Sequence, residues 1–214
     1  MSAERPEPGL LIDAAGSLWG IVLCGGASSR MGSDKASLTF GGEALLARMV
    51  RIVGGVTEQV IVVASPAQRL PPLPKLVRVV HDRQPGRGPL EGLAAGLQAV
   101  GDEQAVAFVT SCDAPLLRPA VIERVVSLLG AHDCAAPLIN ELLQPLTAAY
   151  RVSLLPRLEQ ALADQQLGIW RLLEKLDTRR ILPAELTDAD PELESFRTCN
   201  TPEEYRALLD ATPE

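Results

Sequence analysis

The sequence predicts an α/β protein in which a doubly wound, mainly parallel sheet is sandwiched between helices. Two observations support this prediction. Short apolar runs alternate with segments of helical period in the order β-α-β-β-α-β-α, which requires crossover connections. The runs are also apolar almost without interruption, as expected for parallel strands that are covered on both faces.

The first half of the chain supplies three strands and two helices. An apolar run at residues 18–24 ends in a glycine pair, which indicates a buried strand followed by a glycine loop. Residues 43–53 place Leu, Met and Val at helical spacing, with arginines left for the wet face. β-branched runs at residues 59–64 and 77–80 predict two more buried strands, and a helix is expected at residues 88–100.

The second half continues the alternation. Its predicted elements are a strand at 105–110, a helix at 119–129 with proline in its first turn, a strand at 143–150, helices at 152–163 and 169–176, a short element at 196–199 and a helix that starts at 202. We expect residues 17–214 to form a single domain, because a chain of 214 residues has room for one domain of ordinary size. Residues 1–16, which include Pro and Glu, are expected to form a mobile leader.

The charge balance and the cysteines limit the class of protein. The chain carries 20 Lys and Arg against 27 Asp and Glu, which gives a net charge of −7 at pH 7. An acidic chain has no general attraction to nucleic acids or anionic lipids, so any phosphate chemistry relies on a few local cations. No apolar run approaches the roughly 20 residues that span a bilayer, and the start of the chain lacks the pattern of a signal peptide. With its cysteines scattered singly, we expect a cytoplasmic protein with reduced thiols, monomeric and without nucleic-acid or membrane partners.

The loop after the first strand carries the strongest chemical signal. In an open parallel sheet, ligands bind beyond the carboxyl ends of the strands. Here Gly25 and Gly26 allow backbone N–H groups to approach a ligand closely, and Arg30 and Lys35 add two positive charges, a combination that suits a triphosphate. The loop matches neither the Walker pattern nor G-x-G-x-x-G. The alternative interpretation is an ordinary glycine turn with a solvated arginine and lysine.

Two acids and an amide follow other strands. Asp82 is either a turn residue or an acceptor for a base or ribose, while His81 beside it is interpreted as structural. Asp113 is well placed to hold Mg²⁺, and its alternative role is to cap the following helix. Asn200 offers an amide oxygen to the same metal, although taken alone the pair Asn200 and Thr201 before Pro-Glu-Glu favours a helix cap. The segment at 88–90 starts a helix whose N-terminus is itself an anion site.

Two other chemistries are disfavoured. Three of the cysteines lie beside these loops, but their spacing offers too few partners for zinc. A serine hydrolase lacks support, because G-x-S-x-G does not occur and the chain has only two histidines.

Five motifs together resemble a known family. They are LCGGASSRMGSDK, HD, RGPLEGLAAG, SCDAPLL and NTPEE, in this order. This series, spread over residues 19–209, is similar to the nucleotidyltransferases of the molybdenum cofactor guanylyltransferase type. The resemblance implies a Rossmann-like nucleotidyltransferase fold. It also implies Mg²⁺-dependent transfer of GMP from GTP to the terminal phosphate of molybdopterin, with release of pyrophosphate.

The resemblance assigns roles at individual positions. In the family, the main chain of the glycine loop reads guanine and cradles phosphates, which corresponds here to Leu23, Cys24, Gly25 and Gly26. Lys35 matches the lysine that contacts the GTP phosphates, Arg30 an arginine that assists it, and Asp82 a nucleotide-contacting acid. Asp113 resembles the aspartate that binds both GTP and Mg²⁺, and Asn200 resembles an asparagine near the metal and the acceptor.

The choice of base follows from the glycine pair. Guanylyl-transferring relatives resemble LAGG at this loop and cytidylyl-transferring ones LAAG, so Gly25 and Gly26 favour guanine, as does the Gly-Pro-Leu-Glu-Gly run at 88–92. Two departures stand out. Cys24 replaces the common alanine, and the strand at 60–64 does not end in asparagine, which leaves the ribose contact unassigned around Ala64 and Ser65.

Other activities and the acceptor side stay open. The alternatives are a cytidylyltransferase or another nucleotidyltransferase with a different phosphate acceptor, and a non-catalytic nucleotide-binding protein. Expected partners are GTP and molybdopterin or its carrier proteins. The segments at 139–150 and 168–171 are expected to line the acceptor pocket, where Arg171 either holds a phosphate or lies on a helix surface.

Overall fold

The computed structural model describes residues 16–25, 35–84 and 86–211. The strands are β1 (Leu18–Leu23), β2 (Thr39–Phe40), β3 (Glu43–Ala44), β4 (Gln59–Ala64), β5 (Arg78–His81), β6 (Val106–Ser111), β7 (Cys134–Ile139), β8 (Leu142–Leu143), β9 (Thr147–Arg151) and β10 (Thr178–Ile181). The α-helices are α1 (Leu45–Gly54), α2 (Pro89–Val100), α3 (Pro119–Ser127), α4 (Leu155–Ala163), α5 (Ile169–Leu173) and α6 (Pro202–Ala211). Short 3-10 helices are η1 (Lys35–Ser37), η2 (Val152–Leu154), η3 (Pro183–Glu185) and η4 (Glu194–Phe196). All but Gly16 of the predicted leader lies outside the described residues.

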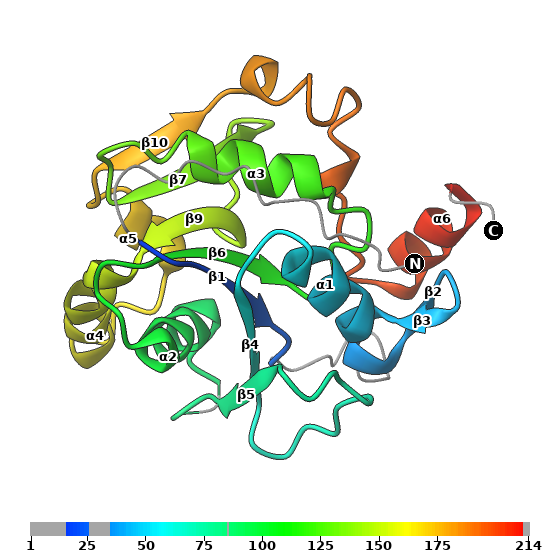
Figure 1. The fold of residues 1–214 in the computed structure, drawn as a ribbon, viewed down its shortest axis with the longest axis horizontal. Helices are drawn as coiled ribbons and strands as arrows, with labels where there is room; N and C mark the ends of the chain where they lie inside the picture. Colours follow the sequence, from blue (N-terminus) through cyan, green and yellow to red (C-terminus); the bar gives the residue numbers. More distant parts are fainter. Residues whose placement is uncertain (1–15, 26–34, 85, 212–214) are drawn as a thin grey trace, which may run out of the picture.

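One large, twisted sheet forms the centre of the molecule (Figure 1). Its strand order is β10-β7-β9-β6-β1-β4-β5, with β8 paired to β7. β1 lies between β4 and β6 and is parallel to both, and β5 is parallel to β4. The predicted mainly parallel sheet is therefore confirmed, and the carboxyl ends of four neighbouring strands meet along one edge.

Part of the sheet departs from the sequence prediction. β9 runs antiparallel to β6 and β7, so the sheet is mixed. It also starts at Thr147, four residues later than the strand predicted from 143. β7 was not predicted, because its sequence CAAPLI contains a proline and two alanines, residues with low strand propensity. β10 was missed for a related reason, since its sequence TRRI carries two arginines at the edge of the sheet.

Helices cover both faces of the sheet, as predicted. In the described residues, α2, α4 and α5 pack on one face, where Leu93 and Leu158 meet Ile21 in a common apolar cluster. α1 and α3 cover the other face, where Met49 and Ile122 join a cluster that contains Val22. Successive β1 residues thus point into opposite cores, which is why the strand is apolar without interruption. Among these residues, we find no helix of the length and apolarity that crossing a bilayer demands.

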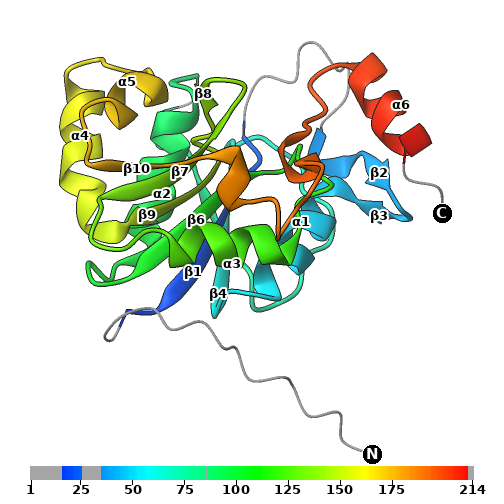
Figure 2. The same cartoon turned by 90° about the horizontal axis from the view of Figure 1, so that it is seen from above.

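The C-terminal segment crosses back over the carboxyl edge. Helix α6 lies beside the β2-β3 hairpin, at the opposite end of the molecule from α4 and α5 (Figure 2). A small cluster containing Phe40, Cys199 and Leu208 joins α6 to the hairpin, and the Tyr205 hydroxyl donates to the Thr39 carbonyl. The Cys199 N–H donates to the Asp113 carbonyl at 2.9 Å, so this segment is fixed directly against the loop after β6.

Candidate active site

The carboxyl edge is kept in register beyond the ends of the strands. The Cys24 N–H donates to the Val63 carbonyl at 2.9 Å, the Cys112 N–H to the Leu23 carbonyl at 3.0 Å, and the Asp82 N–H to the Ala64 carbonyl at 3.0 Å. The residues that follow β1, β4, β5 and β6 therefore start from fixed positions along one line. Gly26 and Arg30, which the sequence also singled out, lie outside the described residues.

Lys35 connects two residues from distant parts of the sequence. Its Nζ lies 3.0 Å from Asp113 Oδ2 and donates to Asn200 Oδ1 at 2.8 Å. The side chains of Lys35 and Asp113 are each 16% exposed, so their ion pair is largely shielded from water. Three residues that sequence motifs placed on separate loops thus meet at one point of the edge.

Asp113 is held on its side chain and its backbone. The Ser111 hydroxyl donates to Oδ1, while the Asp113 carbonyl accepts the Cys199 N–H and lies 3.5 Å from Cys199 Sγ. The alternative role of Asp113 as a helix cap is wrong, because the N-cap of α3 is Arg118, which makes no side-chain cap bond. Sequence reasoning did not single out Ser111, although it stands in the same motif, two residues before Asp113.

Asn200 precedes a helix that is capped by its neighbour. The Thr201 hydroxyl accepts the Glu204 N–H at 3.2 Å, while Glu204 Oε2 accepts the Asn200 and Thr201 N–H groups. This reciprocal arrangement is a capping box. The predicted helix cap is thus present and is formed by Thr201, while the Asn200 amide oxygen faces Lys35.

Asp82 lies against the glycine loop at the other end of the edge. A Cβ added to Gly25 would lie 2.9 Å from Asp82 Oδ2 and 3.1 Å from Ser65 Oγ, so only glycine fits there without displacement. Burial raises the pKa of Asp82, and the negative charge of Glu91 raises it further, while His81 acts in the opposite direction. The edge thus has an acidic, glycine-lined end and a Lys-Asp-Asn end.

The loop between β5 and α2 is fixed by a buried acid that sequence reasoning missed. The Glu91 side chain is 3% exposed and pairs with Arg83 Nε at 3.2 Å and Arg87 at 3.8 Å. Arg83 also pairs with Glu159 at 3.1 Å, which ties the loop to α4. These residues border a hollow of about 260 Å³. Because Glu91 lies in the first turn of α2, the protein's own carboxylate already stands at the helix start that was interpreted as an anion site.

The thiols near the edge are buried. Burial raises the pKa of Cys112 well above its ordinary value and that of Cys199 to about 11, so both are neutral at pH 7. Within the part of the chain that the structure describes, no three His, Cys, Asp or Glu side chains are grouped to hold a metal by themselves.

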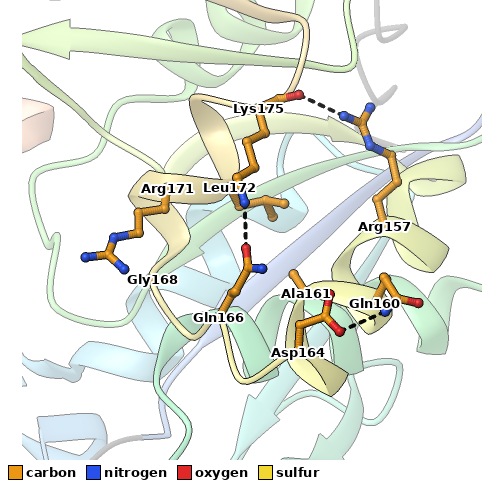
Figure 3. A pocket seen from close by; sticks show the side chains of 9 residues that line it. All are labelled: Arg157, Gln160, Ala161, Asp164, Gln166, Gly168, Arg171, Leu172 and Lys175. Atoms are coloured by element: carbon orange, nitrogen blue, oxygen red, sulfur yellow. Dashed lines mark hydrogen bonds between the residues drawn. The ribbon is translucent and has the colours of Figure 1, made fainter.

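A separate pocket of about 240 Å³ lies between α4 and α5 (Figure 3). Arg171 lines it together with Arg157 and Lys175, so the structure places Arg171 in a pocket with two other cations. In Figure 3 its guanidinium extends away from Arg157, which pairs with Asp133 at 2.7 Å. The pocket does not include Lys35, Asp113 or Asn200.

The order of the strands and the residues gathered around Lys35 at their carboxyl edge define an open α/β sheet with a polar ligand-binding edge, and comparison with known proteins makes the chain a nucleotidyltransferase. A family model described as "MobA-like NTP transferase domain" matches residues 20–180. The chain belongs to this family.

Individual relatives agree with the family assignment. The chain is 34% identical to the molybdenum cofactor guanylyltransferase of Desulfosudis oleivorans over 190 residues, 86% of this chain and 91% of the relative. The structure is similar to that of molybdopterin-guanine dinucleotide biosynthesis protein A from Archaeoglobus fulgidus, with a TM-score of 0.75, 22% identity and coverage of 90% and 97% of the two chains. A 2-C-methyl-D-erythritol 4-phosphate cytidylyltransferase from Thermus thermophilus shares the fold at a TM-score of 0.67 and 15% identity, over 92% and 98%.

Proposed function

We propose that this enzyme transfers GMP from GTP to the terminal phosphate of molybdopterin in a Mg²⁺-dependent reaction, giving the guanine dinucleotide cofactor and pyrophosphate. One observation carries the proposal. Lys35 Nζ lies within 3.0 Å of Asp113 and Asn200, at the strand edge that also holds Gly25 and Asp82. The name of the Desulfosudis oleivorans relative, which is aligned over most of both chains, supports the choice of nucleotide and acceptor.

The two ends of the edge suit the two ends of a nucleotide. At the glycine end, the main chain from Leu23 to Gly26 would contact the base, and Asp82 would accept hydrogen bonds from the base or ribose. At the other end, the Lys35 ammonium would pair with the triphosphate, assisted by Arg30. This division places the uncharged part of the ligand beside the acid and the most negative part beside the lysine.

The donor atoms at the Lys-Asp-Asn end fit Mg²⁺. Asp113 supplies carboxylate oxygen and Asn200 an amide oxygen, and both already hold a cationic group, the Lys35 ammonium. Mg²⁺ prefers oxygen ligands and is commonly held by one or two carboxylates together with substrate phosphates. Asp113 and Asn200 would thus hold the ion. When bound, it would neutralise charge on the triphosphate and on the departing pyrophosphate.

The reaction requires that the two substrates be positioned and that the charge on their phosphates be neutralised. A phosphate oxygen of the acceptor forms a new bond to the α-phosphorus of GTP, the bond between the α-phosphorus and its bridging oxygen breaks, and pyrophosphate leaves with that electron pair. Little general-base help is needed, because a phosphate monoester is largely ionised near neutral pH. Lys35 would exchange its contact with Asp113 for the triphosphate, and the bonds from Ser111 and Cys199 would keep Asp113 in place.

The proposal is tested by pyrophosphate release with Mg²⁺ and molybdopterin in the presence of GTP, CTP, ATP or UTP, one at a time. Release with GTP alone is the expected result. Release with CTP alone would retain the nucleotidyltransferase assignment and overturn the choice of guanine. If no pyrophosphate were released with any of the four nucleotides, using molybdopterin verified as active with another enzyme, the result would favour a different acceptor or a non-catalytic nucleotide-binding protein.

Gly25→Ala is expected to weaken nucleotide binding without unfolding the protein. The added methyl would lie 2.9 Å from Asp82 Oδ2 and 3.2 Å from the Ser65 nitrogen, so the Asp82 carboxylate must move. We expect KM for GTP to rise about tenfold, which corresponds to ~1.4 kcal/mol. Gly54→Ala, at the end of α1, is the matched control, because its added methyl would lie 3.4 Å from Val60 Cγ2 in β4, an ordinary contact distance. Equal KM values for the two variants would contradict the prediction.

Asp82→Asn is expected to change stability and binding in opposite directions at pH 7. Burial is the main reason that the pKa of Asp82 is raised in the folded protein. The folded state is therefore favoured while this carboxyl is protonated at low pH, and that stabilisation is lost as the pH rises through the folded pKa. Replacing the acid should therefore raise Tm at pH 7 but not at pH 3, and it should increase KM for GTP. Thermal unfolding at the two pH values, together with nucleotide kinetics, measures both effects. The prediction would be contradicted if the Tm difference between Asp82→Asn and the wild type were the same at pH 3 and pH 7.

A further inference from the structure

Gln68 joins two strand ends at the glycine end of the edge. Its Nε2 donates to the Cys24 carbonyl at 2.9 Å, and its Oε1 accepts the Ser65 N–H at 3.2 Å. The backbone N–H of Gln68 donates to the Ser65 carbonyl at 3.0 Å, which closes a turn over residues 65–68. One side-chain amide therefore connects the end of β1 to the loop after β4.

These bonds fix the orientation of one peptide unit. The Cys24 carbonyl and the Gly25 N–H belong to the same planar peptide group. Gln68 holds the carbonyl side, and the Val63 carbonyl accepts the Gly25 N–H at 3.3 Å on the other side. Cys24 is only 6% exposed, so a carbonyl left without its Gln68 bond would lose a partner in a place with little access to water.

The fixed peptide borders the place where Gly25 and Asp82 meet. A Cβ on Gly25 would lie 3.2 Å from the Ser65 nitrogen, the same N–H that Gln68 accepts, and 2.9 Å from Asp82 Oδ2. Gln68 therefore holds the backbone at Cys24, just before Gly25, and at Ser65, which lies against Gly25. Polar groups that are fixed before binding discriminate between ligands better than groups that must reorganise.

We propose that Gln68 is a positioning residue for base selection: it fixes the 24–25 peptide and the Ser65 N–H in the orientation that sorts one nucleobase from the others. This inference rests on the proposed function, in which the main chain of this loop contacts the base. Gln68 acts through the backbone, so its loss should change nucleotide affinity and selectivity and should leave the rate at saturating nucleotide nearly unchanged.

The test measures direct binding of GTP, CTP, ATP and UTP, with Mg²⁺ and without acceptor, to the wild type and to two variants. Gln68→Glu retains an oxygen for the Ser65 N–H but turns the donor to Cys24 into an acceptor, and Gln68→Met removes both bonds at similar size. We expect Kd for the preferred nucleotide to rise about tenfold in both variants, with a smaller ratio between the Kd values of the weakest and the preferred nucleotide. In a separate assay with molybdopterin present, kcat should stay within about twofold of the wild type. Gln98→Glu, an exposed position on α2 with the same charge change, should behave as the wild type.

The inference would be contradicted if the variants folded and kept the nucleotide selectivity of the wild type. It would also be contradicted if a lowered Tm were their only defect, because Gln68 would then have a purely structural role. Equal binding of all four nucleotides by the wild type would also overturn the inference, because there would be no selection to position. A wild type that prefers another nucleotide would refute guanylyl transfer. The Gln68 inference would still hold if the variants weakened the wild type's preference for that other nucleotide, and it would fail if they left the preference unchanged.

Discussion

Asp113→Ala is expected to lose turnover almost completely, with kcat lower by on the order of 10³-fold. Asp113 is the only carboxylate in the described part of the edge that contacts Lys35, and its own position is fixed by Ser111 and Cys199. Removing it takes away the proposed metal ligand and leaves the Lys35 ammonium without its ion pair. Pyrophosphate release with GTP, Mg²⁺ and molybdopterin measures the loss, with circular dichroism to verify folding.

Two further variants separate chemistry from stability. Asp188→Ala makes the same change at an exposed acid and should keep full activity. Asp113→Asn keeps the size of the side chain and an oxygen for Ser111, yet it should stay nearly inactive because a neutral amide is a weaker ligand for Mg²⁺ than a carboxylate. Near-normal activity of a folded Asp113→Ala protein would remove Asp113 from the site.

Lys35→Ala is expected to lower kcat/KM for GTP by on the order of 10²-fold. Lys35 is the only cation in the described part of the edge that contacts both Asp113 and Asn200, so its loss removes the positive charge proposed to face the triphosphate. Lys35→Arg should recover part of the activity, because a planar guanidinium retains the charge but not the compact geometry of an ammonium.

The matched control for Lys35 is Lys75→Ala. Lys75 is exposed, so its replacement changes the net charge equally and should leave the kinetics unchanged. If Lys35→Ala and Lys75→Ala gave the same kcat/KM, the triphosphate would have to bind elsewhere. Steady-state kinetics over a range of GTP concentrations also show whether the effect lies in binding, in turnover or in both.

The parallel half of the sheet was predictable mainly because its three inner strands, β1, β4 and β6, are buried on both faces. The prediction that residues 77–80 form a buried strand is wrong in its burial, because β5 lies at the sheet edge and is largely exposed. Burial on two sides leaves an uninterrupted apolar run in the sequence, which β1, β4 and β6 display. The strands at the other end of the sheet leave a weaker signal. β7 contains Pro137, and β10 carries two consecutive arginines at the edge of the sheet, so neither matches the pattern of a strand.

The sequence predicted which residues form the candidate site better than it predicted which of them are in contact. Lys35, Asp113 and Asn200 were each singled out by a motif, but their meeting depends on how the C-terminal segment crosses the edge, which no local pattern encodes. Gln68 bonds to the backbone of Cys24 and Ser65, and the buried Glu91 pairs with Arg83 and Arg87. Such roles leave no signature in a single sequence, because each depends on partners 44 residues away or on packing between loops and helices.

The central claim is that the α-phosphate of GTP moves to the acceptor, and isotope labelling tests it most directly. The enzyme is incubated with Mg²⁺, molybdopterin and GTP labelled with ³²P at either the α or the γ position. Guanylyl transfer predicts that the α label appears in the dinucleotide product and the γ label only in pyrophosphate. Recovery of the γ label on the acceptor or as free phosphate would contradict the account, because the reaction would then be phosphoryl transfer or hydrolysis.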